Sequence, residues 1–438
     1  MTQTSTTILA RIAAAYHLPI DLRLAPALFE LLHACGDPHE HLPPVLHVAG
    51  TNGKGSTCAF MRALLESTGY RVHVYTSPHL VSFHERIRLN GTLIAEAALV
   101  ALLQEVESKC APGTVSYFEF TTVAALLAFA RTPADFVILE TGLGGRLDAT
   151  NIVAKPVATA IARISFDHRE YLGTTLAEIA AEKAGIMKPG VPCCIGQQMA
   201  PEVAQIFSRV AAEKDTPLLY HGRDWHIHPG GSKGFRYTDR LGAVDLPHPA
   251  LVGAHQIANA ALALACLRLG AGIALTQTQQ AQGMVKVAWP GRLQLLKQGT
   301  LVDLLPKGWE IWLDGGHNDS AGEVLAHQAA QWQGQDGAIP RPLHIIYGML
   351  KTKKPEEFLR PLVPHIAALR SVAIPDEVNS MPITNLVAAA RTIGIRDAAP
   401  ALDLYQAVKN LTQLSAKPGR ILICGSLYLV GQVLRQNS

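Results

Sequence analysis

The chain has 438 residues, which predicts two or three domains at roughly 150 residues each. With 48% hydrophobic and 17% charged residues it can bury large cores, and extensive disorder is not expected. The formal net charge of +3 gives no electrostatic reason to expect a nucleic-acid partner. No apolar run reaches the roughly 18 residues of a membrane span, no secretory leader is apparent, and the seven cysteines form no C-x-x-C pair. We therefore expect a cytoplasmic protein with reduced thiols that binds neither nucleic acid nor membrane.

Short apolar runs alternate with helix-length segments along the first part of the chain. Strands are predicted at residues 45–50, 70–77, 134–142 and 156–165. Residues 53–68, between the first two of these runs, have the character of a helix. Continuous apolar strands that alternate with helices predict a parallel sheet covered on both faces. The histidine- and glycine-rich segment 221–239 favours a surface hairpin over a metal site, because no carboxylates support its histidines.

The strand pattern starts again after Trp289, with runs at residues 309–316, 341–350, 369–375 and 420–426. The turn sequence WPGR, residues 289–292, is a natural place for one domain to end. We therefore divide the chain into two α/β domains, residues 1–288 and 289–438.

The segment GTNGKGST, residues 50–57, follows the first strand and opens the predicted helix. Its glycines permit tight turns, so that backbone N–H groups and the positive end of the helix can face one phosphate. Lys54 adds a charge for terminal phosphates, and Ser56 and Thr57 add hydroxyls. The standard phosphate loop has its hydroxyl directly after the lysine, whereas here Gly55 intervenes. By itself the segment predicts a nucleotide site.

Further polar residues follow the other predicted strands of the first domain. Ser77, Glu140 and the pair Asp167–His168 come where ligands gather at the carboxyl ends of parallel strands. Ser77, Glu140 and His168 can together hold magnesium beside phosphates, although histidine is an uncommon magnesium ligand. From its spacing alone, Lys183 is expected to be an exposed lysine on a helix.

Several segments in order resemble the folylpolyglutamate synthase and dihydrofolate synthase family, relatives of the Mur peptide ligases. They include GTNGKGS, TSPHL, ERIR, ETGLGGRLDATN, EKAGI, DGGHN and CGSLYL. The resemblance extends over residues 20–430, nearly the whole chain, and the additional glycine of the loop is usual in this family. It implies a phosphate-loop domain of the Mur-ligase type and a smaller Rossmann-like C-terminal domain that contributes to glutamate ligation.

The resemblance also implies a reaction. Such enzymes use ATP and Mg²⁺ to convert a carboxylate into an acyl phosphate, which the amino group of L-glutamate then attacks. The acid is dihydropteroate, which gives dihydrofolate, or a reduced folate, which gives folylpolyglutamates. The compact bacterial-type sequence favours both activities in a monomer. A synthase for folylpolyglutamates alone is the main alternative.

Residue roles follow by motif from the resemblance. Lys54, Glu140, His168 and Lys183 are the implied catalytic residues, with Ser77 and Glu140 on one magnesium ion and His168 on a second. Lys183 matches a position that carries a carbamate derived from CO₂. The implied ATP-binding residues are Gly50, Thr51, Asn52, Gly53, Lys54, Gly55, Ser56, Thr57, Asn259, Arg292 and Asp314. His317, Asn318 and Ser426 are implied in glutamate binding, and segments 20–24 and 118–122 in bounding the acceptor site.

The sequence departs from the family pattern in two places. Lys354 stands where an aspartate is common, which leaves the role of loop 351–357 open, and Asp319 replaces a frequent proline. A Mur-type cell-wall ligase is a second hypothesis, but the phosphate loop begins too early for a uridine-nucleotide domain to precede it. A GTPase-like switch is a third, but the guanine-reading N-K-x-D motif is missing.

Overall fold

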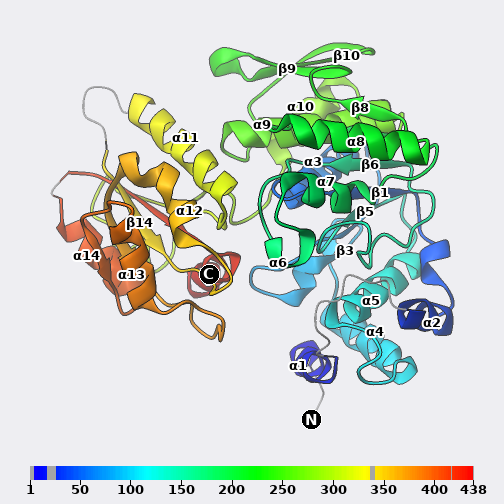
Figure 1. Cartoon of the computed structure of the whole chain (residues 1–438), viewed down its shortest axis with the longest axis horizontal. Coiled ribbons are helices and arrows are strands. Elements are labelled where there is room, and N and C mark those ends of the chain that lie inside the picture. The colour runs from blue at the N-terminus through cyan, green and yellow to red at the C-terminus, as the bar shows by residue number, and fades with distance from the viewer. Residues whose placement is uncertain (1–3, 17–25, 336–340, 416, 438) are drawn as a thin grey trace. The chain divides into compact units, whose positions relative to one another are not determined.

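The computed structural model describes residues 4–16, 26–335, 341–415 and 417–437, and the chain forms two compact units (Figure 1). The first unit consists of Met1–Ala250 and Ala254–Ala288, and the second of Leu251–Gly253 and Trp289–Ser438. Both are α/β structures, as predicted. Each is described by itself below.

The first unit is built on a sheet that contains eight strands among the described residues, in the order β4-β3-β2-β5-β1-β6-β7-β8. The strands are β1 Val45–Ala49, β2 Val72–Tyr75, β3 Ile87–Leu89, β4 Thr92–Leu93, β5 Phe136–Glu140, β6 Ala158–Ile161, β7 Cys193–Ile195 and β8 Leu218–Tyr220. The run from β2 to β8 is parallel, while β3 and β4 are antiparallel additions at one edge. The four predicted strands are confirmed as β1, β2, β5 and β6, and they are neighbours in the sheet.

The helices of this unit cover the sheet and carry its functional loops (Figure 1). They are α1 Ser5–Ala15, α2 Pro26–Ala34, α3 Lys54–Glu66, α4 Glu96–Lys109, α5 Tyr117–Arg131, α6 Arg169–Leu172, α7 Leu176–Ala184, α8 Pro201–Lys214, α9 Ala254–Ala265 and α10 Gln277–Lys286. Helix α3, predicted from the sequence, packs against α9 and α10, and α7 packs against α8. Within the described ranges, no helix has both the length and the apolar character that crossing a membrane requires.

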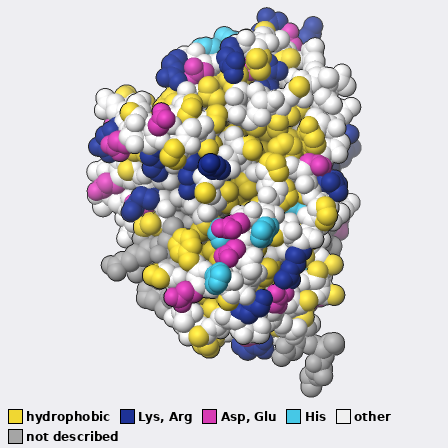
Figure 2. Space-filling view, turned by 90° about the vertical axis from the view of Figure 1, so that its right-hand side faces the viewer, with side chains coloured by type: hydrophobic (Ala, Val, Ile, Leu, Met, Phe, Trp, Pro, Cys, Tyr) yellow, Lys and Arg dark blue, Asp and Glu magenta, His cyan; other side chains and the backbone are white. Residues whose placement is uncertain are grey.

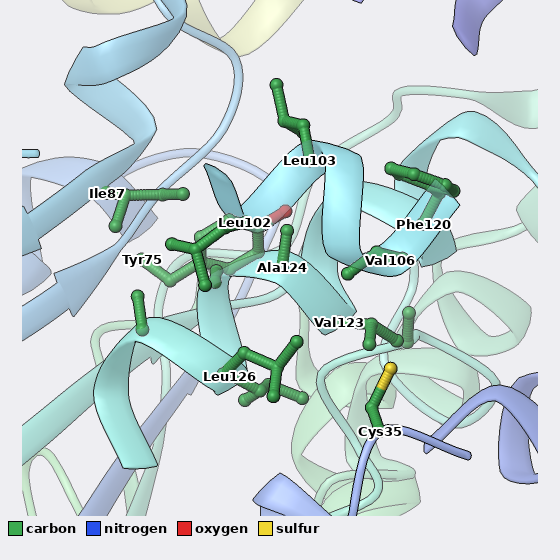
Figure 3. Close-up of a cluster of buried hydrophobic side chains, with 14 of the residues drawn as sticks. Cys35, Tyr75, Ile87, Leu102, Leu103, Val106, Phe120, Val123, Ala124 and Leu126 are labelled. Atoms are coloured by element: carbon green, nitrogen blue, oxygen red, sulfur yellow. The ribbon is translucent and has the colours of Figure 1, made fainter. Parts of the chain in front are cut away.

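Helix α5 contains the most apolar stretch of the sequence, and its burial explains that composition. Phe120, Val123 and Leu126 pack with side chains of α4 such as Leu103 and Val106 (Figure 3). A helix that is apolar on nearly all sides must be buried on nearly all sides. Each such side chain contributes about 1.5–3 kcal/mol when it leaves water, so this cluster anchors the β2–β3 edge of the sheet.

A small antiparallel sheet extends the first unit. It contains β9 Trp225–Pro229, β10 Phe235–Asp239 and β11 Gly242–Leu246. Strands β9 and β10 are the hairpin predicted for residues 221–239, and the sequence did not predict β11. Asp239, completely buried at its side chain, accepts hydrogen bonds from Arg268 at 2.8 and 3.0 Å. This ion pair ties the small sheet to the segment that follows α9.

The second unit contains a six-stranded sheet within its described residues, in the order β12-β13-β17-β14-β15-β16. Its strands are β12 Gln294–Leu296, β13 Glu310–Leu313, β14 Leu343–Tyr347, β15 Ile366–Ser371, β16 Ala398–Pro400 and β17 Arg420–Cys424. Its helices are α11 Asp319–Gln335, α12 Pro355–Leu359, α13 Ile383–Thr392, α14 Leu404–Gln413 and α15 Leu427–Gln436. The four predicted strands are confirmed as β13, β14, β15 and β17, all parallel, with β12 antiparallel at the edge.

The surface carries charges of both signs. Figure 2 shows one face of the molecule, on which basic side chains lie among acidic ones rather than in one continuous basic stripe. This mixture agrees with the small net charge of +3.

We predict that Arg268→Met lowers the free energy of unfolding by about 3–5 kcal/mol, because it leaves the carboxylate of Asp239 buried and unpaired. The matched control is Arg236→Met, since Arg236 pairs with Asp245 at 2.7 Å with both side chains more than half exposed. The control should lose less than about 1 kcal/mol. Urea unfolding followed by circular dichroism measures both, and equal losses would contradict the prediction.

Candidate functional site

The loop after β1 depends on two glycines that side chains cannot replace. Gly50 has φ 146°, and a Cβ there would lie 2.8 Å from the Cβ of Ala162. Gly53 has φ 90°, and a Cβ there would lie 2.3 Å from Oδ1 of Asn259. The sequence-predicted residue Asn259, on α9, therefore lies directly against this loop.

The loop is fixed by hydrogen bonds to the segment that follows β6. The backbone N–H groups of Thr51 and Asn52 donate to the carbonyl of Arg163 at 2.9 and 3.2 Å. The Thr51 hydroxyl donates to the carbonyl of Ser165 at 3.0 Å and accepts from its N–H at 3.2 Å, and Asn52 Nδ2 donates to Ser165 Oγ at 3.0 Å. Two neighbouring parallel strands thus hold the loop in one shape, which favours a pre-formed anion site.

Lys54 begins α3, and its ammonium lies over the loop. Nζ donates to the carbonyls of Gly50 at 3.1 Å and Thr51 at 3.5 Å. A phosphate is a stronger partner for an ammonium than a neutral carbonyl is. Ser56 and Thr57 are buried in the same helical turn, and Thr57 Oγ1 has no hydrogen-bond partner within the described residues. The start of α3 therefore offers a cation, a helix N-terminus and an unpartnered hydroxyl.

Glu140 ends β5 and is only 4% exposed. Its Oε2 accepts a hydrogen bond from the backbone N–H of Ser77 at 3.2 Å. Burial raises the pKa of the Cys58 thiol in α3, and Glu140 raises it further while Lys54 lowers it. Glu140 is also the register partner of Val48 in β1, two residues before Gly50, so it lies beside the start of the phosphate loop.

The donors at this place fit magnesium better than softer metals. Mg²⁺ prefers oxygen ligands and is commonly bound by one or two protein groups together with substrate phosphates. The Glu140 carboxylate and the Ser77 hydroxyl are such groups. The described residues contain no group of three or more His, Cys, Asp and Glu that could hold a metal ion.

His168 follows β6, the strand next to β1 in the same sheet. It has φ 49° and precedes α6, and its side chain is 43% exposed. Its Nε2 lies 3.9 Å from Oδ2 of Asp167. Asp167 and His168 thus both follow β6, where the sequence places them.

The expectation that Lys183 is an exposed lysine on a helix is wrong, because the residue is only 4% exposed. Its Nζ makes no hydrogen bond or ion pair within the described part of the chain. Burial, helped by the charge of Lys54, lowers the pKa of Lys183 from 10.5 to about 7, and Asp167, Asp148 and Glu182 offset part of this effect. A large share of this buried amine is therefore neutral near neutral pH.

Asp314 organises the corresponding edge of the second unit. It follows β13, and its carboxylate accepts hydrogen bonds from the N–H groups of Leu293 at 2.9 Å and Gly316 at 2.7 Å. Burial raises its pKa, and the nearby charge of Arg292 acts against that rise. The structure therefore brings the two sequence-predicted residues Arg292 and Asp314 together.

The predicted residues His317, Asn318 and Ser426 lie at the same edge, because β13 and β17 are parallel neighbours. The N–H of Gly425 donates to the carbonyl of Gly316 at 3.0 Å and joins the two loops. His317 Nδ1 lies 2.9 Å from the carbonyl of Gly315. Asn318 Oδ1 accepts from Ala321 N at 3.0 Å, and Ser426 Oγ accepts from Tyr428 N at 3.1 Å. Asn318 and Ser426 thus also cap α11 and α15.

The remaining sequence-predicted segments have mixed outcomes. Phe118, in segment 118–122, lies against the backbone of the loop after β5, since a Cβ on Gly142 would lie 2.4 Å from its ring. Residues 20–24 lie outside the described residues. Lys354 precedes α12 and pairs with Glu357 at 3.2 Å, and Asp319 accepts a hydrogen bond from Ser320 N at 2.6 Å, so both have local roles.

Sequence reasoning missed the buried carboxylate of Asp148. Oδ2 accepts from Leu143 N at 2.8 Å, and Oδ1 accepts from the N–H and hydroxyl of Thr150 at 3.0 and 2.6 Å. His47 Nε2 lies 2.8 Å from the same hydroxyl. The D-x-T pattern, in which an aspartate binds the backbone two residues later, is a local signal that points to this turn.

Comparison with known proteins gives a consistent result over almost the whole chain. The model of the Mur ligase middle domain matches residues 48–267, and that of the dihydrofolate synthetase C-terminal domain matches residues 300–436. The dihydrofolate synthase/folylpolyglutamate synthase of Bacillus subtilis is 31% identical over 424 residues, which cover 93% of each chain.

Solved structures agree with the sequence matches. Escherichia coli FolC in complex with DHPP and ADP has a TM-score of 0.87 at 28% identity, and the match covers 99% of this chain and 97% of that one. A bifunctional folylpolyglutamate synthase/dihydrofolate synthase with Mn, AMPPNP and L-glutamate bound has a TM-score of 0.83 at 30% identity, covering 99% of both chains.

We predict that Lys183→Met stabilises the protein at neutral pH in CO₂-free buffer. Between pH 7 and 10.5 the unfolded chain binds a proton at Lys183 that the folded chain does not, so wild-type stability rises with pH across this window. The variant lacks this rise, and its advantage should shrink from pH 7 towards pH 10.5. The measurement is urea unfolding at several pH values, with exposed Lys155→Met as control. An advantage that does not change with pH would contradict the prediction.

Proposed function

The chain belongs to the dihydrofolate synthase/folylpolyglutamate synthase family, and we propose that it ligates L-glutamate to dihydropteroate and to reduced folates with ATP. The observation that supports this most directly is the edge of the first sheet. There the phosphate loop is hydrogen-bonded to the segment after β6, Asn259 lies against Gly53, and Glu140 at the end of β5 accepts a hydrogen bond from Ser77 N. The relatives named above carry both activities in their names, which favours the bifunctional assignment.

The two units have different tasks in this proposal. Residues 1–288 bind ATP, with residues 50–57 around the phosphates and Asn259 behind them. In residues 289–438, Arg292 binds the phosphates of ATP and Asp314 the nucleotide end. L-Glutamate is bound by His317, Asn318 and Ser426.

The reaction requires activation of a poor electrophile. An oxygen of the acceptor carboxylate attacks the γ-phosphorus of ATP, the bond to the β-phosphate oxygen breaks, and ADP leaves. The glutamate nitrogen then attacks the acyl carbon, inorganic phosphate leaves, and the nitrogen loses a proton. Lys54 and the start of α3 counter the charge on the transferring phosphoryl group. Magnesium held by Ser77 and Glu140 would neutralise phosphate charge, and His168 would contribute to a second ion.

Lys183 suits modification by CO₂. Its neutral nitrogen attacks the carbon of CO₂, an N–C bond forms, one proton leaves, and the product is a carbamate anion. The pKa of about 7 leaves enough neutral amine for this step at neutral pH. The change from a cation to an anion also removes the repulsion between Lys183 and Lys54 and creates an oxygen donor for a metal.

Other assignments remain open to test. A synthase for folylpolyglutamates alone differs in rejecting dihydropteroate, and a Mur-type peptide ligase differs in its acceptor. The cytoplasmic location and the monomeric state stay predictions from the sequence.

The assay that tests the proposal measures ADP release by the purified protein with Mg²⁺ and each acceptor. We predict L-glutamate-dependent ADP and a product larger by one glutamyl residue with both dihydropteroate and tetrahydrofolate. Lys54→Met should lower kcat by at least about a hundredfold, because it removes the positive charge that stabilises the transferring phosphoryl group. The control Lys155→Met should retain wild-type rates. Product from tetrahydrofolate but not from dihydropteroate would support the monofunctional alternative. A lack of glutamate-dependent ADP release with both acids would refute the proposal.

We predict that ¹³C-labelled bicarbonate gives a carbamate signal in ¹³C NMR of the intact protein. The signal should grow as pH rises from 6 to 8, because deprotonation of Lys183 with a pKa of about 7 supplies the nucleophile. Lys183→Met should lose the signal and Lys155→Met should keep it. A signal equal in the two variants would place the carbamate elsewhere.

A further inference from the structure

The segment that carries Ser77 forms a closed loop between β2 and β3. Residues 76–86 leave and return between neighbouring antiparallel strands, in which Tyr75 pairs with Ile87. The N–H of Thr76 donates to the carbonyl of Arg86 at 3.0 Å and closes the loop at its base. Ser77, the next residue, donates its N–H to Glu140.

The carboxylate of Glu85 gathers the middle of this loop. Oε2 accepts a hydrogen bond from Leu80 N at 2.8 Å, and Oε1 accepts from Val81 N and Ser82 N at 2.9 Å each. Glu85 lies in the short 3₁₀ helix η2, Phe83–Arg86, where a capping carboxylate needs to reach only Ser82 N. The hydrogen bonds from Leu80 N and Val81 N are not needed to cap the helix. They order residues that precede it.

The same short helix is anchored in the core of the unit. Phe83 belongs to the buried cluster around α4 and α5. Arg86 places its guanidinium 5.3 Å from the centre of the Phe83 ring and donates from Nε to His79 Nδ1 at 3.0 Å. Glu85 therefore links a fixed element to a turn that would otherwise expose three backbone donors.

We propose that Glu85 is a positioning residue that holds the loop 76–86 so that Ser77 stays beside Glu140 for metal binding. The inference rests on the proposed function, which gives Ser77 and Glu140 the magnesium ion. Glu85 binds only the three backbone N–H groups and would affect the metal through the position of Ser77. Both of its oxygens accept hydrogen bonds, so a glutamine must turn its NH₂ towards at least one backbone N–H, and that bond is lost.

The first test compares Glu85→Gln with the wild type by amide hydrogen exchange. We expect exchange at Leu80, Val81 and Ser82 to become about tenfold faster, because bonds to a charged acceptor are lost. The control is Asp135→Asn, which removes a carboxylate that accepts a loop N–H, from Arg71 at 2.7 Å, at the opposite end of β5 from Glu140. Exchange at residues 80–82 in this control should match the wild type. Unchanged exchange in Glu85→Gln would overturn the proposed role of Glu85.

The second test measures Mn²⁺ affinity in the presence of AMPPNP by electron paramagnetic resonance. Loss of a group that orients metal ligands typically weakens binding by about 10–100-fold, and we expect at least the lower value for Glu85→Gln. The affinity for AMPPNP without metal should change less than twofold in that variant, as both affinities should in Asp135→Asn. Faster exchange with wild-type Mn²⁺ affinity would make Glu85 purely structural and overturn the inference.

A conservative variant covers the case in which Glu85→Gln does not fold. Glu85→Asp keeps two acceptor oxygens on a shorter side chain, so we expect faster exchange at residues 80–82 and weaker Mn²⁺ binding than in the wild type, each by less than about tenfold. Wild-type values in Glu85→Asp would overturn the inference. Neither measurement depends on turnover, so wild-type protein without glutamate-dependent ADP release would refute the proposed function while these tests still decide the role of Glu85.

Discussion

The charge of Lys54 acts on a second lysine, Lys183, inside the first unit, and this repulsion constrains the residues around both. Burial alone disfavours the ammonium form of Lys183, and Lys54 disfavours it further, while Asp167 and Asp148 offset only part of the effect. A protonated Lys183 near Lys54 needs anions, and its lowered pKa indicates that the described carboxylates balance this charge only in part. In the proposed reaction, the phosphates of ATP and a carbamate on Lys183 supply them, so ligand binding completes the charge balance.

Much of the precision of this arrangement comes from side-chain oxygens that bind backbone amides. Glu85 holds three N–H groups in the loop after β2, and Asp148 holds the turn after β5. Asp314 does the same after β13 in the second unit. Each carboxylate fixes a loop at the carboxyl end of a parallel strand, where irregular backbone must present ligands. A loop ordered in this way has little conformational freedom left to lose when a substrate binds.

The strands that sequence reasoning found are those whose apolar runs are long enough to stand out, such as β5 and β14. It missed β7 and β8, which have three residues each, and the antiparallel strands at the sheet edge. Lys183 was expected on the surface from its spacing, although Ile179, Ala180 and Ala184 share its helix face and are buried. That periodicity was the sequence signal for burial of Lys183. The role of Glu85 had no such signal, because it binds backbone N–H groups, which nearly every residue type provides.

The glycine between Lys54 and Ser56 has a consequence for the metal. In the standard phosphate loop, the residue after the lysine supplies a hydroxyl to magnesium. Here Gly55 takes that position, and the proposed donors are Ser77 and Glu140, from the ends of β2 and β5. Those strands are neighbours, and their ends are joined by the bond from Ser77 N to Glu140. In the proposed site, the loop can dispense with its own hydroxyl only while the segment after β2 keeps its shape. Contacts far from the phosphate loop in sequence would then control metal binding.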